Sequence, residues 1–407
     1  MQLRGSLDRV DSEFIEGWIT CAEAPDLKVV LEVWLGGNLL GHAAADRFRA
    51  DLAESDIGDG HCAFSFKLPS FIPDSQLNQI KLKLVNTDFL WLPEKLPGVA
   101  VATNGTAIAT PSRFGGLWID RPDWIDRLAE KVRAGEISDA LSVGIFKFCR
   151  DGYYVIPGAV SETLVASLNE ELDQAWKSPP PGLLVETFEP DGVMKYVTPD
   201  QAYRDGRTKL LDFYAHSALA RKAIAAPRVI EFLSAIFDDK PKAFQGLYFQ
   251  RGSPQAIHKD TAYVKVDTNP LALAATWLAL EDVSPGTGEL EYYIGSHRAP
   301  EFLFGGYSKW MEGFADEHDA FLQSLHDDAR TLGHVKGSFL AKKGDVLVWH
   351  ADLAHGDSRV TQPDRTRRSL VTHFTAAEEE PFYRRNSRHE QMEADGCIFV
   401  SQYGDVG

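Results

Sequence analysis

Cysteine is scarce in this sequence, with four residues in 407. Cys21, Cys62, Cys149 and Cys397 lie far apart, and none belongs to a Cys-x-x-Cys pair. The spacing therefore excludes a cysteine zinc cluster and a dense disulfide framework. Reduced thiols are typical of the cytoplasm, and we expect the protein there.

Long apolar runs and excess positive charge are missing as well. No run approaches the ~18 apolar residues of a spanning helix, so we expect no contact with a membrane. The first eight residues, MQLRGSLD, contain no apolar core of a signal peptide. Lys and Arg number 42 against 59 Asp and Glu, for a net charge of −17. This acidity argues against nucleic acid as a partner.

Residues 1–92 predict a small β-sandwich domain. Apolar residues alternate with others over 27–35, 64–68 and 80–84, as in strands with one buried face. Gly36, Gly37 and Asn38 predict a turn after the first of these strands. Because this part contains no metal or nucleophile motif, we expect an accessory domain that contacts carbohydrate or protein.

Residues 93–117 have the composition of a linker, with several Pro, Gly, Ala and Thr. The remainder, 118–407, predicts a larger domain that is mainly β with flanking helices, an α+β class. Helices are expected over 123–147 and 161–177, with Ser161 as the N-cap of the second. Strands are expected over 244–250, 262–266, 273–280, 290–294, 344–350 and 369–374.

The sharpest local motif is His258-Lys259-Asp260. On a strand, residues i and i+2 point to the same face, so the imidazole and carboxylate project together. These two ligands and one distant histidine match the 2-His-1-carboxylate triad of non-haem Fe(II) oxygenases. His350 and His355 both follow the apolar segment 346–349, and both could supply the third ligand.

Other residues on neighbouring strands are candidates for the same site. Arg367 offers a guanidinium that could clamp the distal carboxylate of 2-oxoglutarate with two parallel hydrogen bonds, whereas Arg368 points the other way. Gln245, on the strand before the metal motif, is a candidate neighbour of the co-substrate. His297, Tyr263 and Lys265 are candidates for contact with the substrate; the last two share one face of the expected strand 262–266.

The order of these motifs resembles the phytanoyl-CoA dioxygenase family of Fe(II)/2-oxoglutarate oxygenases over about 140–385. The resemblance rests on the sequences at 258–260, 275–283, 288–290, 295–298 and 344–356, and on the strand of Arg367. It implies that His258, Asp260 and His355 bind iron, that Arg367 binds 2-oxoglutarate, and that Trp277 flanks the co-substrate. It also implies a double-stranded β-helix, a variant of the jelly roll.

The resemblance further implies Fe(II) as the metal and O2 and 2-oxoglutarate as co-substrates, with release of succinate and CO2. Because Asp260 is present, hydroxylation of a small molecule is favoured over halogenation; desaturation and cyclisation stay open. The substrate is expected to be sugar-linked, a secondary metabolite or an acyl compound. Two other functions compete: an idle jelly roll that binds glycans or acts as a scaffold, and a metal-dependent isomerase or hydrolase.

Two features fall outside the family pattern. Many members carry Ser two residues after the distal histidine, where this chain has Asp357. A carboxylate beside an anionic co-substrate is unfavourable unless it faces away or is paired. Residues 46–52 and 58–66 resemble a small β module that accompanies bacterial enzymes of glycan metabolism.

Overall fold

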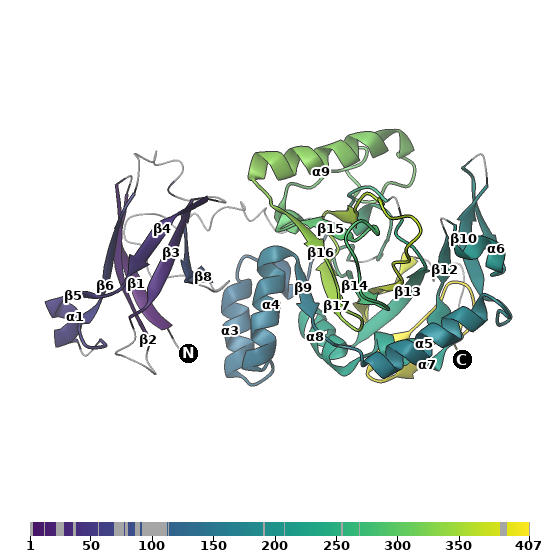
Figure 1. Cartoon of the computed structure of the whole chain (residues 1–407), viewed down its shortest axis with the longest axis horizontal. Coiled ribbons are helices and arrows are strands. Elements are labelled where there is room, and N and C mark those ends of the chain that lie inside the picture. The colour runs from purple at the N-terminus through teal and green to yellow at the C-terminus, as the bar shows by residue number, and fades with distance from the viewer. Residues whose placement is uncertain are drawn as a thin grey trace. The chain divides into compact units, whose positions relative to one another are not determined.

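A computed structural model divides the chain into two compact units, Met1–Ile108 and Ala109–Gly407 (Figure 1). The structure describes residues 3–11, 13–21, 28–35, 38–55, 57–68, 77, 80–85, 90–91, 112, 114–189, 192–206, 208–253, 255–267, 269–382 and 389–406. The predicted linker 93–117 lies outside these ranges except for 112 and 114–117. Within them, no helix is both long and apolar enough to cross a membrane.

The first unit is a β-sandwich, as its alternating pattern predicts. One sheet has the order β1-β2-β6-β5 and the other β4-β3-β7-β8. Ile15 and Ile19 of the first sheet share one apolar cluster with Leu31 and Val33 of the second. The bounds are β1 Leu3–Val10, β2 Phe14–Cys21, β3 Val30–Leu35, β4 Asn38–Ala44, β5 Arg47–Phe48, α1 Ala50–Glu54, β6 His61–Lys67, β7 Ile80–Leu84 and β8 Leu90–Trp91. Gly36 and Gly37 of the predicted turn lie outside the described residues.

Helices precede and flank the strands of the second unit. They are α3 Trp124–Arg133, α4 Asp139–Asp151, α5 Glu162–Ala175, α6 Gln201–Arg204, α7 Ala218–Ile224, α8 Pro227–Phe237 and α9 His318–Leu332. Ser161 caps α5 as predicted, since its Oγ accepts from the Leu164 N–H at 3.3 Å. The prediction of a single helix over 123–147 is wrong. Gly135 has φ +74°, and Ser138 caps a new helix, α4.

Two sheets form the centre of the second unit. The larger has the order β11-β10-β12-β13-β19-β14-β17-β9, with β21 joined to β13 and β20 to β21; the smaller is β16-β15-β18. The bounds are β9 Tyr153–Ile156, β10 Leu184–Phe188, β11 Met194–Val197, β12 Lys209–Leu211, β13 Pro241–Phe249, β14 Ala274–Ala279, β15 Leu290–Tyr293, β16 Lys336–Phe339, β17 Val346–His350, β18 His355–Asp357, β19 Ser369–Ala376, β20 Met392–Ala394 and β21 Cys397–Phe399.

The faces of the larger sheet have different partners. Leu278 and Val348 pack in one cluster with Leu168 of α5 and Phe232 of α8, so helices cover the outer face (Figure 1). Alternate residues such as Trp277 turn inward and share a second cluster with residues of the smaller sheet, including Leu290 and Tyr292. Two facing sheets, antiparallel except for the parallel pair β13–β21, share this interior and form the predicted jelly roll.

One predicted strand, 262–266, is not formed. Asp260–Ala262 is instead a 3-10 helix, η3, and Val266 makes only an isolated bridge to Pro381. The assumption that His258 and Asp260 project from one strand is therefore wrong. His258 lies in an isolated bridge with His355, and the chain turns into η3 at Asp260.

Candidate metal centre

His258, Asp260 and His355 come together in the interior of the jelly roll. Each offers one ligand atom, and these atoms lie within 4.8 Å of one another. The backbones of the two histidines pair directly: each N–H donates to the other's carbonyl, at 2.8 and 2.9 Å. Asp260 Oδ1 lies 3.7 Å from His258 Nε2 and 3.6 Å from His355 Nε2. All three residues are buried.

Both imidazoles are oriented by their own backbone. His258 Nδ1 lies 2.8 Å from the Ala256 carbonyl oxygen, and His355 Nδ1 lies 2.9 Å from that of Leu353. A carbonyl only accepts, so each Nδ1 carries the proton and each Nε2 carries a lone pair. His258 Nε2 lies 3.0 Å from Gln255 Nε2, and His355 Nε2 faces Asp260 Oδ1. Burial lowers the pKa of His355 to about 4, which keeps this imidazole neutral near pH 7. Two imidazoles and a carboxylate suit Fe(II).

The carboxylate of Asp260 is fixed through its second oxygen. Trp349 Nε1–H donates to Oδ2 at 2.7 Å, which leaves Oδ1 facing the two histidines. Burial would raise the pKa of Asp260, but His355 and His373 lower it well below its usual value. The group is therefore an anion and can bind a cation through one oxygen.

His373 is a member of this site that the sequence analysis missed. It lies on β19, is buried, and its Nε2 is 3.5 Å from Asp260 Oδ2. Neither ring nitrogen has a hydrogen-bond partner among the described residues. The sequence contains a signal for it. If side chains alternate along the strand that follows Arg367, residues 369, 371 and 373 lie on the same face as Arg367.

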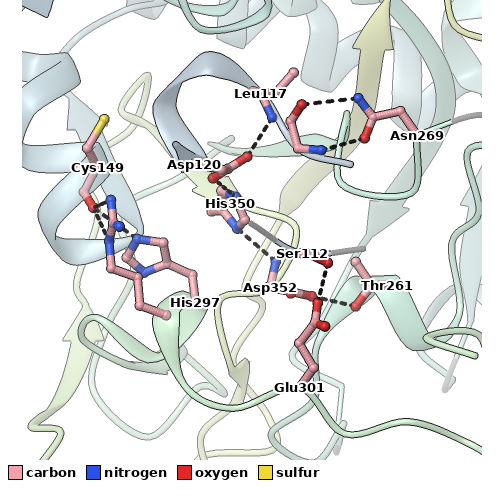
Figure 2. Close-up of polar contacts among 12 residues, drawn as sticks. Ser112, Leu117, Asp120, Cys149, Thr261, Asn269, His297, Glu301, His350 and Asp352 are labelled. Atoms are coloured by element: carbon pink, nitrogen blue, oxygen red, sulfur yellow. Dashed lines mark hydrogen bonds and ion pairs between the residues drawn. The ribbon is translucent and has the colours of Figure 1, made fainter. Parts of the chain in front are cut away.

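His350 lies outside the group of possible metal ligands. Its Nε2 is 2.8 Å from Asp120 Oδ1, and its Nδ1 accepts from the Asp352 N–H at 3.0 Å (Figure 2). Both ring nitrogens are thus engaged away from the centre. The arrangement favours His355 over His350 as the third ligand.

Asp352 forms a second His-x-Asp sequence with His350 and supports the centre from outside. Its Oδ1 accepts from Thr261 Oγ1 at 2.6 Å, and its Oδ2 pairs with the buried Lys309. Lys309 also contacts Glu301 at 2.8 Å, and Glu301 accepts from Ser112 Oγ at 2.6 Å (Figure 2). Because Thr261 follows Asp260, this network anchors the turn that presents the Asp260 carboxylate.

The residues expected to bind the co-substrate line the same interior. Gln245 of β13 pairs in register with His373, so their side chains share a face, and Gln245 is half-buried. Trp277 is buried, and its ring centroid lies 5.4 Å from the guanidinium carbon of Arg367. Arg368 points elsewhere, with Nε–H donating to the Tyr248 hydroxyl at 2.9 Å.

The expected substrate contacts are engaged within the protein. Tyr263 Oη lies 2.7 Å from His318 Nε2, and its ring packs edge-on against His258, with centroids 5.4 Å apart. Lys265 Nζ lies 4.5 Å from the ring centroid of Trp310. His297 Nε2 lies 3.0 Å from the Cys149 carbonyl oxygen (Figure 2). Of the three, only Tyr263 touches a residue of the metal group.

Asp357 pairs with the arginine that the resemblance assigns to the co-substrate. Arg367 Nη1 lies 3.1 Å from Asp357 Oδ1, and Nη2 lies 3.3 Å from Oδ2. The sequence left open whether this carboxylate faces away or is paired; it is paired.

Solved structures provide distant likenesses. The α-ketoglutarate-dependent epimerase SnoN from nogalamycin biosynthesis is 19% identical with a TM-score of 0.45, covering 59% of this chain and 84% of its own. EctD from S. alaskensis with bound Fe is 20% identical with a TM-score of 0.43, covering 57% and 75%. No curated protein sequence matches significantly.

The family assignment rests on the sequence over the catalytic unit. Residues 148–369, more than half of the chain, match the family model for phytanoyl-CoA dioxygenase. This segment contains β13, η3, β14, β17 and β18, and with them the His258, Asp260 and His355 group. The chain therefore belongs to the phytanoyl-CoA dioxygenase family of non-haem Fe(II)/2-oxoglutarate-dependent oxygenases.

Proposed function

We propose that this enzyme hydroxylates an unactivated C–H bond of a small molecule and converts 2-oxoglutarate to succinate and CO2. The observation that carries the proposal is the buried group of two imidazoles and one carboxylate, with Oδ1 of Asp260 facing both Nε2 atoms. In this proposal His258, Asp260 and His355 hold Fe(II). The bound iron supplies the activation of O2 that C–H hydroxylation needs.

The protein's own contribution is to orient, to exclude water and to fix protonation states. The Ala256 and Leu353 carbonyls keep both imidazoles in the tautomer with an unprotonated Nε2, and the Nε2 of His258 also lies 3.0 Å from Gln255 Nε2. Trp349 holds Asp260 through Oδ2, so the carboxylate offers one ligand oxygen and leaves positions for 2-oxoglutarate and O2. Arg367 receives the distal carboxylate of 2-oxoglutarate, and Trp277 and Gln245 lie beside it.

The proposal extends to the class of substrate. We infer a sugar-linked compound, a secondary metabolite or an acyl compound, with the β-sandwich unit as a contact for carbohydrate or protein. Desaturation or cyclisation would use the same residues. An idle glycan-binding protein would not need the pre-oriented tautomers of His258 and His355, and these support the enzyme over that alternative.

Anaerobic reconstitution tests the proposal directly. The full chain is loaded with Fe(II) and titrated with 2-oxoglutarate, and we expect a visible charge-transfer band followed by succinate release when O2 is admitted. Asp260→Ala should bind little iron and show neither signal, because a charged ligand is removed. An iron-loaded wild type that gives no band and no succinate contradicts the proposal.

A further inference from the structure

An ion pair is buried in the interior of the jelly roll. The side chains of Arg367 and Asp357 are 1% and 9% exposed. Both oxygens of the carboxylate face the guanidinium, at 3.1 and 3.3 Å. Asp357 Oδ2 also accepts from the N–H and Oγ–H of Ser253, at 2.9 and 2.6 Å. The carboxylate thus has two sets of donors.

The pair lies in the same interior as the metal centre. Asp357 follows His355 by two residues on β18, so both side chains point to one face. Their register partners on β15, Leu290 and Tyr292, belong to the apolar cluster that also contains Trp277. The guanidinium of Arg367 lies over the Trp277 ring. A co-substrate that spans from the metal to Arg367 therefore reaches Asp357.

The pairing with Asp357 changes the charge that Arg367 presents to a ligand. The pair is neutral as a unit, whereas an arginine without a partner would present a full positive charge to the distal carboxylate of 2-oxoglutarate. Bringing a second carboxylate to one guanidinium leaves a negative charge in excess in a buried place, and this is costly. The buried Nε–H of Arg367 has no hydrogen-bond partner among the described residues.

We propose that Asp357 is a resident counter-ion of Arg367 that weakens binding of 2-oxoglutarate and lowers its advantage over 2-oxo acids with an uncharged tail. This inference rests on the proposed function, since it assumes that 2-oxoglutarate enters this interior. Ser253 positions Asp357 when Arg367 exchanges this carboxylate for the distal carboxylate of 2-oxoglutarate. Its two donors keep Asp357 hydrogen-bonded while Arg367 turns toward the incoming carboxylate.

The test compares two ligands on anaerobic, metal-loaded protein by calorimetry. The ligands are 2-oxoglutarate and 2-oxopentanoate, which has the same carbon chain without the distal carboxylate. Asp357→Asn keeps the shape of the side chain and removes its charge. We expect it to bind 2-oxoglutarate about tenfold more tightly than wild type and 2-oxopentanoate within about twofold. Asp357→Ser should also raise the affinity for 2-oxoglutarate relative to that for 2-oxopentanoate.

Asp173→Asn is the matched control, because Asp173 pairs with the neighbouring Arg368 at 2.9 Å outside the site. It should leave both affinities unchanged. Bound metal, measured for each variant, reports whether the site is intact. Unchanged or weaker 2-oxoglutarate binding by metal-loaded Asp357→Asn overturns the counter-ion inference alone. If no metal-loaded variant binds 2-oxoglutarate at all, the proposed function fails and the inference with it.

Discussion

Single side chains of the candidate centre are each held by a partner that is not itself a ligand. Backbone carbonyls hold the two imidazoles, and the Trp349 indole holds the Asp260 carboxylate. Such partners set ligand orientation and basicity, and their loss typically lowers metal affinity by roughly 10–100-fold. Changes at this scale should alter metal binding while the fold survives.

Replacing each of two histidines separately tests the third ligand. We expect His355→Ala to lose most of its bound iron, because an Nε2 lone pair facing Asp260 disappears. His350→Ala should keep most of its iron, because both nitrogens of His350 are engaged with Asp120 and the Asp352 N–H. Iron content of the purified variants is the measurement. Retention by His355→Ala and loss by His350→Ala would reverse the assignment.

Trp349→Phe tests the support of the carboxylate. The ring volume is largely kept, but the N–H that holds Asp260 Oδ2 is removed. We expect Fe(II) affinity to fall by roughly 10–100-fold. Trp277→Phe is the comparison, since the Trp277 ring lies against the Arg367 guanidinium, with 5.4 Å between its centroid and the guanidinium carbon. Equal iron affinity of Trp349→Phe and wild type would exclude this role for the indole.

Among the elements, the short strand β18 depends on a close approach of two backbones. A Cβ on Gly356 would lie 2.8 Å from the backbone carbon and oxygen of Ala256 and the nitrogen of Ile257. Gly356 lies within β18 and has no positive φ, so it is not a turn glycine. Glycine is needed there because the segment before His258 leaves no room for a side chain.

Gly356→Ala should therefore separate the two histidine-bearing segments. We expect the free energy of unfolding to fall by about 1–3 kcal/mol and iron affinity to fall with it. Denaturant unfolding and iron titration measure both effects. Gly404→Ala, where a Cβ meets nothing within 4 Å, should change neither. A Gly356→Ala protein with wild-type stability and iron affinity would show that the close approach is not required.

At the scale of the whole molecule, the two units have separate interiors. The β-sandwich has its own apolar cluster, and the larger unit contains the metal group together with the helices that cover its sheet. Contacts within each unit define the division at residue 108. This organisation predicts that the catalytic unit folds by itself.

A shortened chain of residues 109–407 tests that independence. We expect it to bind Fe(II) and 2-oxoglutarate as the full chain does, and to release succinate with weaker coupling to a substrate. Calorimetric titration and succinate release are the measurements. An insoluble or iron-free product would show that the first unit completes the catalytic one.

The sequence by itself determined the family, the jelly roll and the β-sandwich, and it predicted His258, Asp260 and His355 as candidate iron ligands. Alternation and motif order are local properties, so strands such as β13 and β17 could be predicted from short stretches of chain. Helix capping at Ser161 was predictable for the same reason. The same locality explains the error at 262–266, where the turn into η3 is held by the distant Asp352.

Only the tertiary structure decided which partners each side chain finds. His350 contacts Asp120, which is 230 residues away in sequence. The Trp349 indole N–H donates to the Asp260 carboxylate. Asp357 and Arg367 belong to different segments, and their pairing depends on the distance between β18 and the start of β19. Spacing along the chain carries no information on such distances, because they are set by the packing of two sheets around one interior.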